Sequence, residues 1–216
     1  MKNPNAHLEA MFEADRQLLR AEEHFLDAGA PGPLLDVLES AFKTAEKQDD
    51  EGEQVLRIRR IVDLAAQLEG GKAVDILLRG LDHAEPSVRV EAGEALLDVG
   101  YERFKEVANA VEARLDRKHE GHSMEELPFI LAEIFDPDPL PLMLRFLEHP
   151  SAEVVASAIE ATVQRGDPLA IRALEKLLDD KRRVTLVDVD DAEAPIGDLA
   201  ADAIAALAGE PDDDES

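Results

Sequence analysis

Two short stretches of this chain carry side chain types that bind metal ions. The first is His119-Glu120-Gly121-His122, but zinc sites on a helix need histidines four positions apart with a glutamate between them. Here the histidines are three positions apart around a glycine, which favours an exposed polar turn. The second, residues 188–193, has several carboxylates but lacks the glycine and the twelfth-position glutamate of a calcium loop. The sequence therefore predicts no metal and no other cofactor.

Nucleophilic catalysis has no recognisable motif either. No serine stands in a G-x-S-x-G elbow, and no glycine-rich phosphate-binding loop is present. Cysteine is absent, which excludes disulfides, thiolate nucleophiles and cysteine-based zinc sites. A triad assembled only in space stays open, because its members need not be close in sequence. We expect a non-catalytic protein.

The charge balance restricts the choice of partner. The chain has 23 Lys+Arg and 49 Asp+Glu, a formal net charge of −26. Nucleic acids and anionic membranes both need a basic protein surface, so we expect neither as a partner. Electrostatic steering instead favours a protein with a basic surface. Residues 1–5 lack an apolar signal core and no apolar run reaches spanning length, which predicts a cytoplasmic location.

The apolar residues indicate helices rather than sheets. They make up 45% of the chain, whereas aromatic residues make up only 4%, with Tyr101 the single tyrosine. Alanine and aliphatic residues at helical spacing suit helices stacked at short distance. A length of 216 residues fits one domain or one continuous repeat array.

An internal repeat relates two parts of the chain. Residues 71–100 align without a gap on residues 137–166, a shift of 66 positions, with nine of thirty positions identical. A shift of 66 corresponds to two units of about 33 residues, the length of a two-helix solenoid repeat. The identical pairs are Leu78/Leu144, Arg79/Arg145, Leu81/Leu147, His83/His149, Val88/Val154, Ala92/Ala158, Glu94/Glu160, Ala95/Ala161 and Gly100/Gly166.

Each unit is expected to be two helices joined by a short turn. In the unit 71–100, Pro86 opens the second helix and Gly100 ends it. In the following unit the first helix is expected near residues 102–117, and a capping-box spacing that begins at Ser123 opens the second. The expected units are residues 31–69, 71–100, 101–136, 137–166 and 167–209.

The two ends and one insertion depart from the repeat. Residues 6–28 form an amphipathic helix that is predicted to cap the exposed end of the stack. Residues 210–216 are predicted to be an acidic disordered tail, so that residues 1–209 form a single domain. Residues 181–195 contain an insertion with a short β-like run at 183–187. We interpret it as a variable surface loop, with a recognition loop as the alternative.

Residues 86–100, PSVRVEAGEALLDVG, resemble the second helix of a HEAT repeat of the bacterial, phycobilin-lyase-like branch. In that branch a Pro-x-Val-Arg start precedes small residues at the helix contact. Asp82 and Arg89 match the Asp/Arg pair that bridges neighbouring repeats in the family, and residues 167–209 are similar to its terminal repeats. The resemblance implies an all-α fold. The expected fold is a right-handed α-α superhelix (HEAT-type solenoid) of about five helix pairs with an N-terminal capping helix.

The chain departs from two enzymatic branches of the family. Members that hydroxylate deoxyhypusine hold two irons with His-Glu pairs on the repeat helices, and Val90 stands here in place of the histidine. The His119-Glu120 dipeptide falls in a predicted turn instead. HEAT-like DNA glycosylases need a basic cleft with aromatic residues, which this composition does not provide. Arg89 also aligns with Val155, so the Asp/Arg ladder is broken after one rung.

The repeat register places acidic side chains in a row on the second helices. Glu91, Glu94 and Asp98 share the helix stripe opposite the core-facing alanines. The resemblance implies that second helices line the concave face, so we expect an acidic groove there, with Phe129 as an apolar anchor. A merely solvated face is the alternative. The predicted partner-binding residues are Asp63, Glu91, Glu94, Asp98, Glu126, Phe129, Glu133, Glu160 and Asp202.

These features predict a non-catalytic protein–protein interaction module that binds a basic partner protein through an acidic concave face. One alternative is an acidic inhibitor or immunity-type protein that masks a nucleic-acid-binding partner. Another is a lyase-type chaperone or an enzyme. Salt-sensitive binding to a basic partner favours the first two functions over the third. If binding blocks that partner's activity, the inhibitor is favoured over the interaction module, which would act only as a scaffold.

Overall fold

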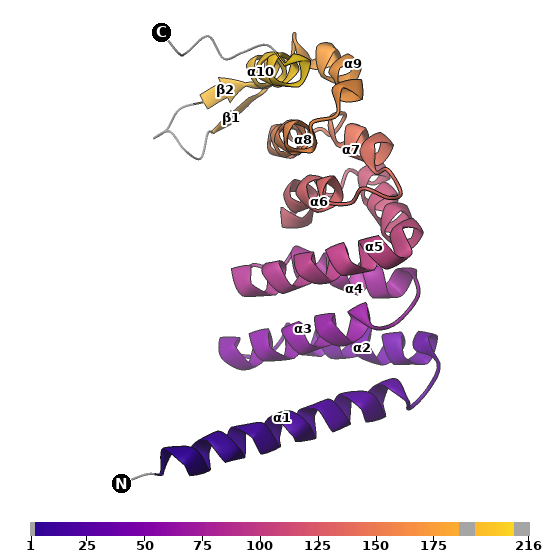
Figure 1. The fold of residues 1–216 in the computed structure, drawn as a ribbon, viewed down its shortest axis with the longest axis vertical. Coiled ribbons are helices and arrows are strands. Elements are labelled where there is room, and N and C mark those ends of the chain that lie inside the picture. The colour runs from indigo at the N-terminus through magenta and orange to yellow at the C-terminus, as the bar shows by residue number, and fades with distance from the viewer. Residues whose placement is uncertain (1–2, 186–192, 210–216) are drawn as a thin grey trace.

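The computed structural model of the chain describes residues 3–185 and 193–209. These residues form ten α-helices, two 3-10 helices and one two-stranded sheet (Figure 1). The predicted all-helical fold is therefore confirmed, apart from the small sheet. In chain order the elements are α1 (Pro4–Leu26), α2 (Pro31–Ala45), α3 (Glu51–Ala66), α4 (Gly71–Leu81), α5 (Pro86–Asp116), α6 (His122–Ala132), α7 (Leu140–Phe146), α8 (Ala152–Arg165), η1 (Pro168–Ala170), α9 (Ile171–Leu174), η2 (Glu175–Leu177), β1 (Arg183–Thr185), β2 (Glu193–Pro195) and α10 (Ile196–Ala208).

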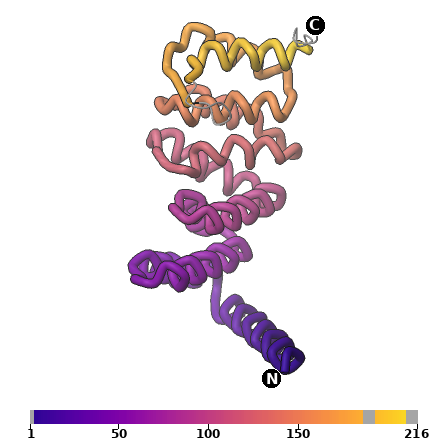
Figure 2. The backbone as a smooth tube through the Cα atoms, turned by 90° about the vertical axis from the view of Figure 1, so that its left-hand side faces the viewer, coloured from indigo at the N-terminus to yellow at the C-terminus, as the bar shows by residue number. Residues whose placement is uncertain are grey.

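The helices stack in layers along the long axis of the molecule (Figures 1 and 2). α2 packs on α3 and α4 packs on α5, and in the C-terminal half α6, α8 and α10 lie on one side with α7 and α9 on the other. Neighbouring layers supply most of the contacts, as in a solenoid. The right-handed sense of the superhelix and the number of helix pairs stay predictions.

Local sequence signals place most helix ends. Pro86 stands at the start of α5, where its missing N–H leaves no bond unmade. Asp50 and Ser151 accept hydrogen bonds from backbone N–H groups in the first turns of α3 and α8. Gly166 and Gly209 end α8 and α10 with a φ of 73°, a left-handed conformation that glycine adopts without strain. These ends need no information from the rest of the fold.

Gly100 does not end its helix, which runs three residues further than was predicted. The range given for α5 joins two helices that meet at a kink at Arg103, whose φ of −137° and ψ of 45° are not helical, so the helix predicted near residues 102–117 is present after the kink. A Cβ atom at Gly100 would lie 2.6 Å from Cδ1 of Ile134, which is fully buried. The glycine is therefore needed for close packing against the next unit and not for a left-handed turn.

Ser123 does not cap α6 either, so the predicted capping box is wrong. The N-cap residue is Gly121, and Ser123 is fully buried. Its backbone N–H donates to Oδ1 of Asp82 at 2.9 Å, and its hydroxyl accepts from Arg114 at 3.2 Å. The carboxylate at the start of α6 thus comes from the preceding unit, where a local spacing rule cannot find it.

The core is a continuous column of buried aliphatic side chains from α2 to α10. Small residues let the layers approach closely. A Cβ atom at Gly80 would lie 2.9 Å from Cγ2 of Val62 and 3.0 Å from Cβ of Ala92, so α4 contacts both α3 and α5 at this point. Both distances are shorter than van der Waals contact, so the close packing of these helices leaves no room for a side chain at Gly80.

α1 is packed differently from every other long helix of the described chain. None of the residues Pro4–Leu26, all of which the structure describes, is buried. Phe25 and Leu26, at the C-terminal end, pack against the core, while the rest of α1 leaves the stack at an angle (Figure 2). The predicted capping helix therefore leaves most of the stack's end uncovered. Its exposed apolar side chains, 39% to 63% accessible, are Leu8, Met11, Phe12, Leu18 and Leu19.

The inserted segment contains a small hairpin. β1 pairs antiparallel with β2, with Val184 opposite Ala194, and Val184 is buried against the core. The β-like run was predicted from the sequence, but its partner strand was not. Residues 188–192 of the predicted carboxylate stretch and the predicted tail, residues 210–216, lie outside the described residues.

Candidate protein-binding face

A first hollow lies between α3 and the first half of α5. It has a volume of about 900 Å³, and four of the predicted binding residues line it, Asp63, Glu91, Glu94 and Asp98. Glu102, one turn further along α5, adds a fifth carboxylate that the sequence analysis missed. The predicted row of acidic side chains is thus brought together in this part of the molecule.

A second hollow, of about 340 Å³, lies between α5 and α6. Glu126, Phe129 and Glu133 line it from α6, and Glu94 lines it from α5. Val90, which is 61% exposed, borders both hollows, as does Glu94. The two hollows therefore meet at Val90 and Glu94 and form one acidic surface with apolar side chains in it. We call this surface the acidic face.

Two carboxylates of the first hollow are already paired. Glu91 of α5 forms an ion pair with Arg59 of α3, and Asp63 lies 2.8 Å from Nη1 of Arg60. The first pair ties α3 to α5, the second lies within α3, and both reduce the negative charge at that edge. Glu94, Asp98 and Glu126 are exposed to solvent, and exposed charges of this kind are easily reached by a partner.

Tyr101 is a further residue of the acidic face that sequence reasoning missed. Its ring is 51% exposed and lines the first hollow, and its hydroxyl donates to the backbone oxygen of Glu133 at 2.6 Å. It therefore bridges α5 to the end of α6. Recognition that α5 runs on past Gly100 would have placed Tyr101 on the same helix as Glu94 and Asp98.

Glu160 and Asp202 do not join the other predicted residues. Both are exposed, on α8 and α10, but neither lines either hollow. Gln164 of α8 does reach the acidic face, since its Nε2 donates to Oε1 of Glu133 at 3.1 Å. The predicted row is therefore split into one cluster on α3, α5 and α6 and isolated charges beyond it.

A polar cluster around Asp82 fixes α6 relative to α4 and α5. Oδ2 of Asp82 accepts from Arg114 at 2.6 Å and lies 2.9 Å from Nε2 of His119. Burial by itself raises the pKa of Asp82, but hydrogen bonds from Ser123 and Arg114 outweigh it and hold the pKa below its ordinary value. Asp82 is thus a charged structural residue. Glu120, Gly121 and His122 are exposed, as was predicted for this turn, whereas His119 is half-buried beside Asp82.

Arg89 does not pair with Asp82, in contrast to the family pattern. Its Nη1 donates to the backbone oxygens of His83 at 3.0 Å and Ala84 at 2.9 Å. Arg114, which the resemblance did not single out, takes the place of Arg89 beside Asp82. The reason is geometric, because Arg89 sits at the start of α5 and reaches back to the turn before it.

Arginines of other units make the same kind of contact to backbone oxygens across unit boundaries. Arg103 donates to two carbonyls at the end of α3, and Arg165 donates to two at the end of α6. Arg182 donates to two in the turn before α8. Helix ends leave carbonyls without intrahelical partners, so these arginines satisfy them and join successive layers.

Among residues 3–185 and 193–209, no group of three His, Asp or Glu side chains is arranged to hold a metal ion. His122, the second histidine of the 119–122 stretch, is exposed at the start of α6. In the same part of the chain, no helix combines the length and apolar character needed to cross a bilayer.

Residues 127–187, which begin in α6 and extend past β1, match the family model described as HEAT repeats. This segment is therefore similar to HEAT repeats. It includes α7 and α8, the helix pair that the internal alignment identified as a unit, which supports the predicted repeat type. No curated protein matches the chain. The phycobilin-lyase-like branch stays a prediction.

Proposed function

We propose that this chain is a non-catalytic module that binds a protein partner through the acidic face. HEAT repeats commonly mediate protein–protein interactions, because stacked helices present an extended surface. The observation that carries the proposal is the grouping of carboxylates around two hollows that meet. These carboxylates are Asp63, Glu91, Glu94, Asp98, Glu102, Glu126 and Glu133.

The composition of the acidic face defines the partner's chemistry. Carboxylates from three helices favour lysine or arginine on the partner and repel the phosphates of nucleic acids. Val90, Tyr101 and Phe129 supply apolar and aromatic area next to these charges. Binding sites often place such anchors at the centre of a polar rim. We therefore expect a basic segment that also carries an apolar side chain.

Charge reversal on the acidic face tests the proposal. In a triple variant, Glu94→Lys, Asp98→Lys and Glu126→Lys replace three exposed carboxylates. We expect association with the captured partner to slow by about tenfold or more and its salt dependence to flatten, because steering acts mainly on the association rate. The partner would be captured from a lysate of the source cells at low salt, and rates would be measured by surface plasmon resonance.

A control variant carries the same change of charge elsewhere. Asp75, Glu148 and Glu175 are exposed and lie outside both hollows, on the first-helix side of their units. Reversal of these three residues to lysine should leave the association rate within about twofold of wild type. Equal rates for the two triple variants would show that the acidic face is only a solvated surface.

A further inference from the structure

α1 carries an apolar stripe that the described chain leaves largely exposed. Met11 and Phe12, then Leu18 and Leu19, recur at a seven-residue spacing along one side of the helix, and the four side chains are 39% to 63% exposed. Helices owe most of their stability in water to the packing of such a stripe. A 23-residue helix without one buried residue therefore calls for a partner surface.

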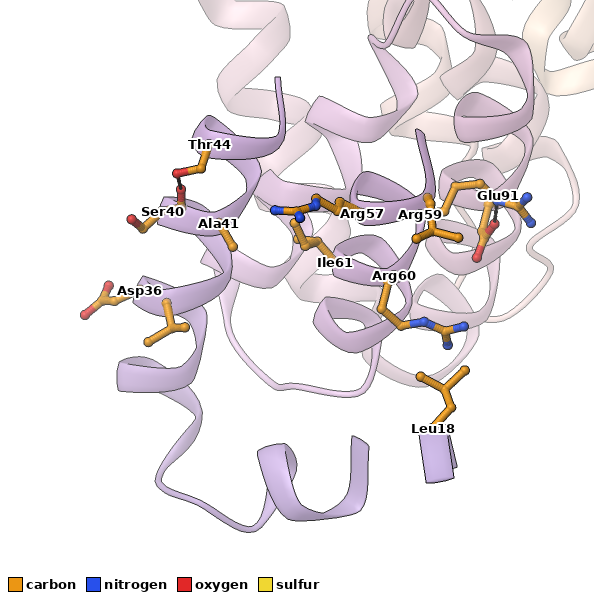
Figure 3. A pocket seen from close by; sticks show the side chains of 12 residues that line it. Leu18, Asp36, Ser40, Ala41, Thr44, Arg57, Arg59, Arg60, Ile61 and Glu91 are labelled. Carbon is orange, nitrogen blue, oxygen red and sulfur yellow. Dashed lines mark hydrogen bonds and ion pairs between the residues drawn. The ribbon is translucent and has the colours of Figure 1, made fainter. Parts of the chain in front are cut away.

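The end of the stack beside α1 offers a matching surface. A hollow of about 1050 Å³ lies there, lined by α2 and α3 and, from α1, by Leu18 (Figure 3). Val37 of α2 and Leu56 of α3, which are 55% and 65% exposed, line it together with Ala41 and Ile61. This end hollow is thus a second uncovered apolar surface of the same molecule.

The end hollow has more positive than negative side chains around it. Arg57, Arg59 and Arg60 line it together with Asp36 and Glu91, in a chain whose net charge is −26 (Figure 3). Arg57 pairs with Glu53, Arg59 with Glu91, and Arg60 with both Asp63 and Glu22 of α1. The ligand that fits this hollow is an amphipathic helix with carboxylates inside its apolar stripe.

α1 is such a helix. Asp15 is three or four residues from Met11, Phe12, Leu18 and Leu19, so it lies within the apolar stripe. Glu22 occupies the equivalent place one heptad later and pairs with Arg60 of its own chain, so a carboxylate at this position of α1 can meet an arginine of the end hollow.

We propose that a second copy of this chain fills the end hollow, so that two copies exchange their α1 helices around a two-fold axis. Each chain carries both halves of the contact, the acidic apolar stripe and the apolar hollow with arginines, as an isologous interface requires. In the exchange, Asp15 of one copy faces the arginines of the other, and the stripe of α1 covers Val37 and Leu56. Each end hollow is incomplete without the partner's helix.

Mass measurement on the full chain tests the exchange. Sedimentation equilibrium should give a dimer for the wild type and at least about a tenfold higher dissociation constant for Met11→Asp and for Leu56→Asp, because each puts a charge into the apolar contact. Leu169→Asp is the matched control, since Leu169 is 74% exposed at the other end of the stack. Far-UV circular dichroism checks that all three variants fold. A monomeric wild type, or dimerisation unchanged in Met11→Asp and Leu56→Asp, overturns the proposal.

Cross-linking identifies the helix that fills the hollow. Because the chain has no cysteine, single variants Leu19→Cys and Leu56→Cys each carry one thiol. The two variants, with different affinity tags, are mixed and treated with a short bis-maleimide. A cross-linked species that carries both tags supports the exchange. Failure to form it, with ready cross-linking inside single chains of the Leu19→Cys/Leu56→Cys double variant, shows that α1 folds back on its own hollow and overturns the proposal.

Discussion

The two units related by the internal alignment, residues 71–100 and 137–166, share a sequence pattern but end in different ways. Gly166 ends α8 with a positive φ, and a Cβ atom there would meet nothing within 4 Å. Gly100, at the aligned position, lies inside α5 and is packed against Ile134. One glycine is needed for its backbone conformation and the other for its lack of a side chain, so the same residue in the same register has two physical roles.

The first helices of the two units also differ in how they fill space. Gly80 in α4 aligns with Phe146 in α7. Gly80 lets Val62 and Ala92 approach closely, whereas Phe146 places a fully buried ring at the aligned position. Side-chain volume is thus matched to the local separation of layers and not to the repeat position. The alignment of the repeats therefore does not fix how an aligned position packs.

Among the variants that test the difference between the two units, Phe146→Ala is expected to change the free energy of unfolding most. Removal of a fully buried ring leaves a cavity, and we expect a loss of about 3–5 kcal/mol in the free energy of unfolding. The reciprocal variant Gly80→Val adds atoms where a Cβ is already too close, for an expected loss of about 1–3 kcal/mol. Urea denaturation followed by far-UV circular dichroism measures both. Losses under about 0.5 kcal/mol in both variants would mean that the two layers are not packed as described.

The loss of stability should be smaller for substitutions at Asp82 and its aligned residue Glu148, and it should differ between the two. Asp82→Ala leaves Arg114 and the backbone N–H of Ser123 without their carboxylate, and we expect a loss of about 2–3 kcal/mol. Glu148 is exposed, so Glu148→Ala should change stability by less than about 0.5 kcal/mol. The same denaturation assay applies. Similar values for the two variants would contradict a structural role for the Asp82 cluster.

The smallest effect concerns a feature that the two units share. Nδ1 of His83 accepts from the backbone N–H of Glu85 at 3.0 Å, and Nδ1 of His149 accepts from that of Ser151 at 3.2 Å. Burial lowers the pKa of both imidazoles below the ordinary value. The folded state therefore favours the neutral ring, and the unfolded state binds more protons between the folded pKa and about 6.5.

Stability should accordingly be complete above about pH 6.5 and should fall as the pH drops through the folded pKa values of the two histidines. His149→Gln, which does not titrate, should show a weaker dependence between about pH 7 and pH 5 than the wild type. The midpoint of urea denaturation at several pH values measures this difference. An equally steep pH dependence in His149→Gln would assign the effect to other groups. Asp82 acts at lower pH, because its pKa lies below the ordinary carboxyl value.

The sequence by itself determined the helical class, the repeat register and most helix ends. Pro86, Ser151, Gly166 and Gly209 act through bonds and angles within about four residues, so their effects are visible in a linear pattern. The internal alignment also found the HEAT-type unit that the family model matches. The same register predicted the carboxylates of α3, α5 and α6 that the structure brings together.

Only the tertiary structure decided which groups meet across units. Asp82 accepts hydrogen bonds from Arg114 and Ser123, and Gly100 packs against Ile134. These contacts could not be predicted, because layers stack at distances that depend on all the intervening side chains. The helix that begins at Pro86 runs as far as the kink at Arg103, so Tyr101 lies on the same helix as Glu94. The packing of the last units leaves Glu160 outside both hollows. The exposed stripe of α1 was likewise beyond the reach of pattern analysis. A periodic apolar stripe predicts that a helix will be covered but does not specify the surface that covers it, because that surface depends on how the whole chain, or a second chain, packs against it.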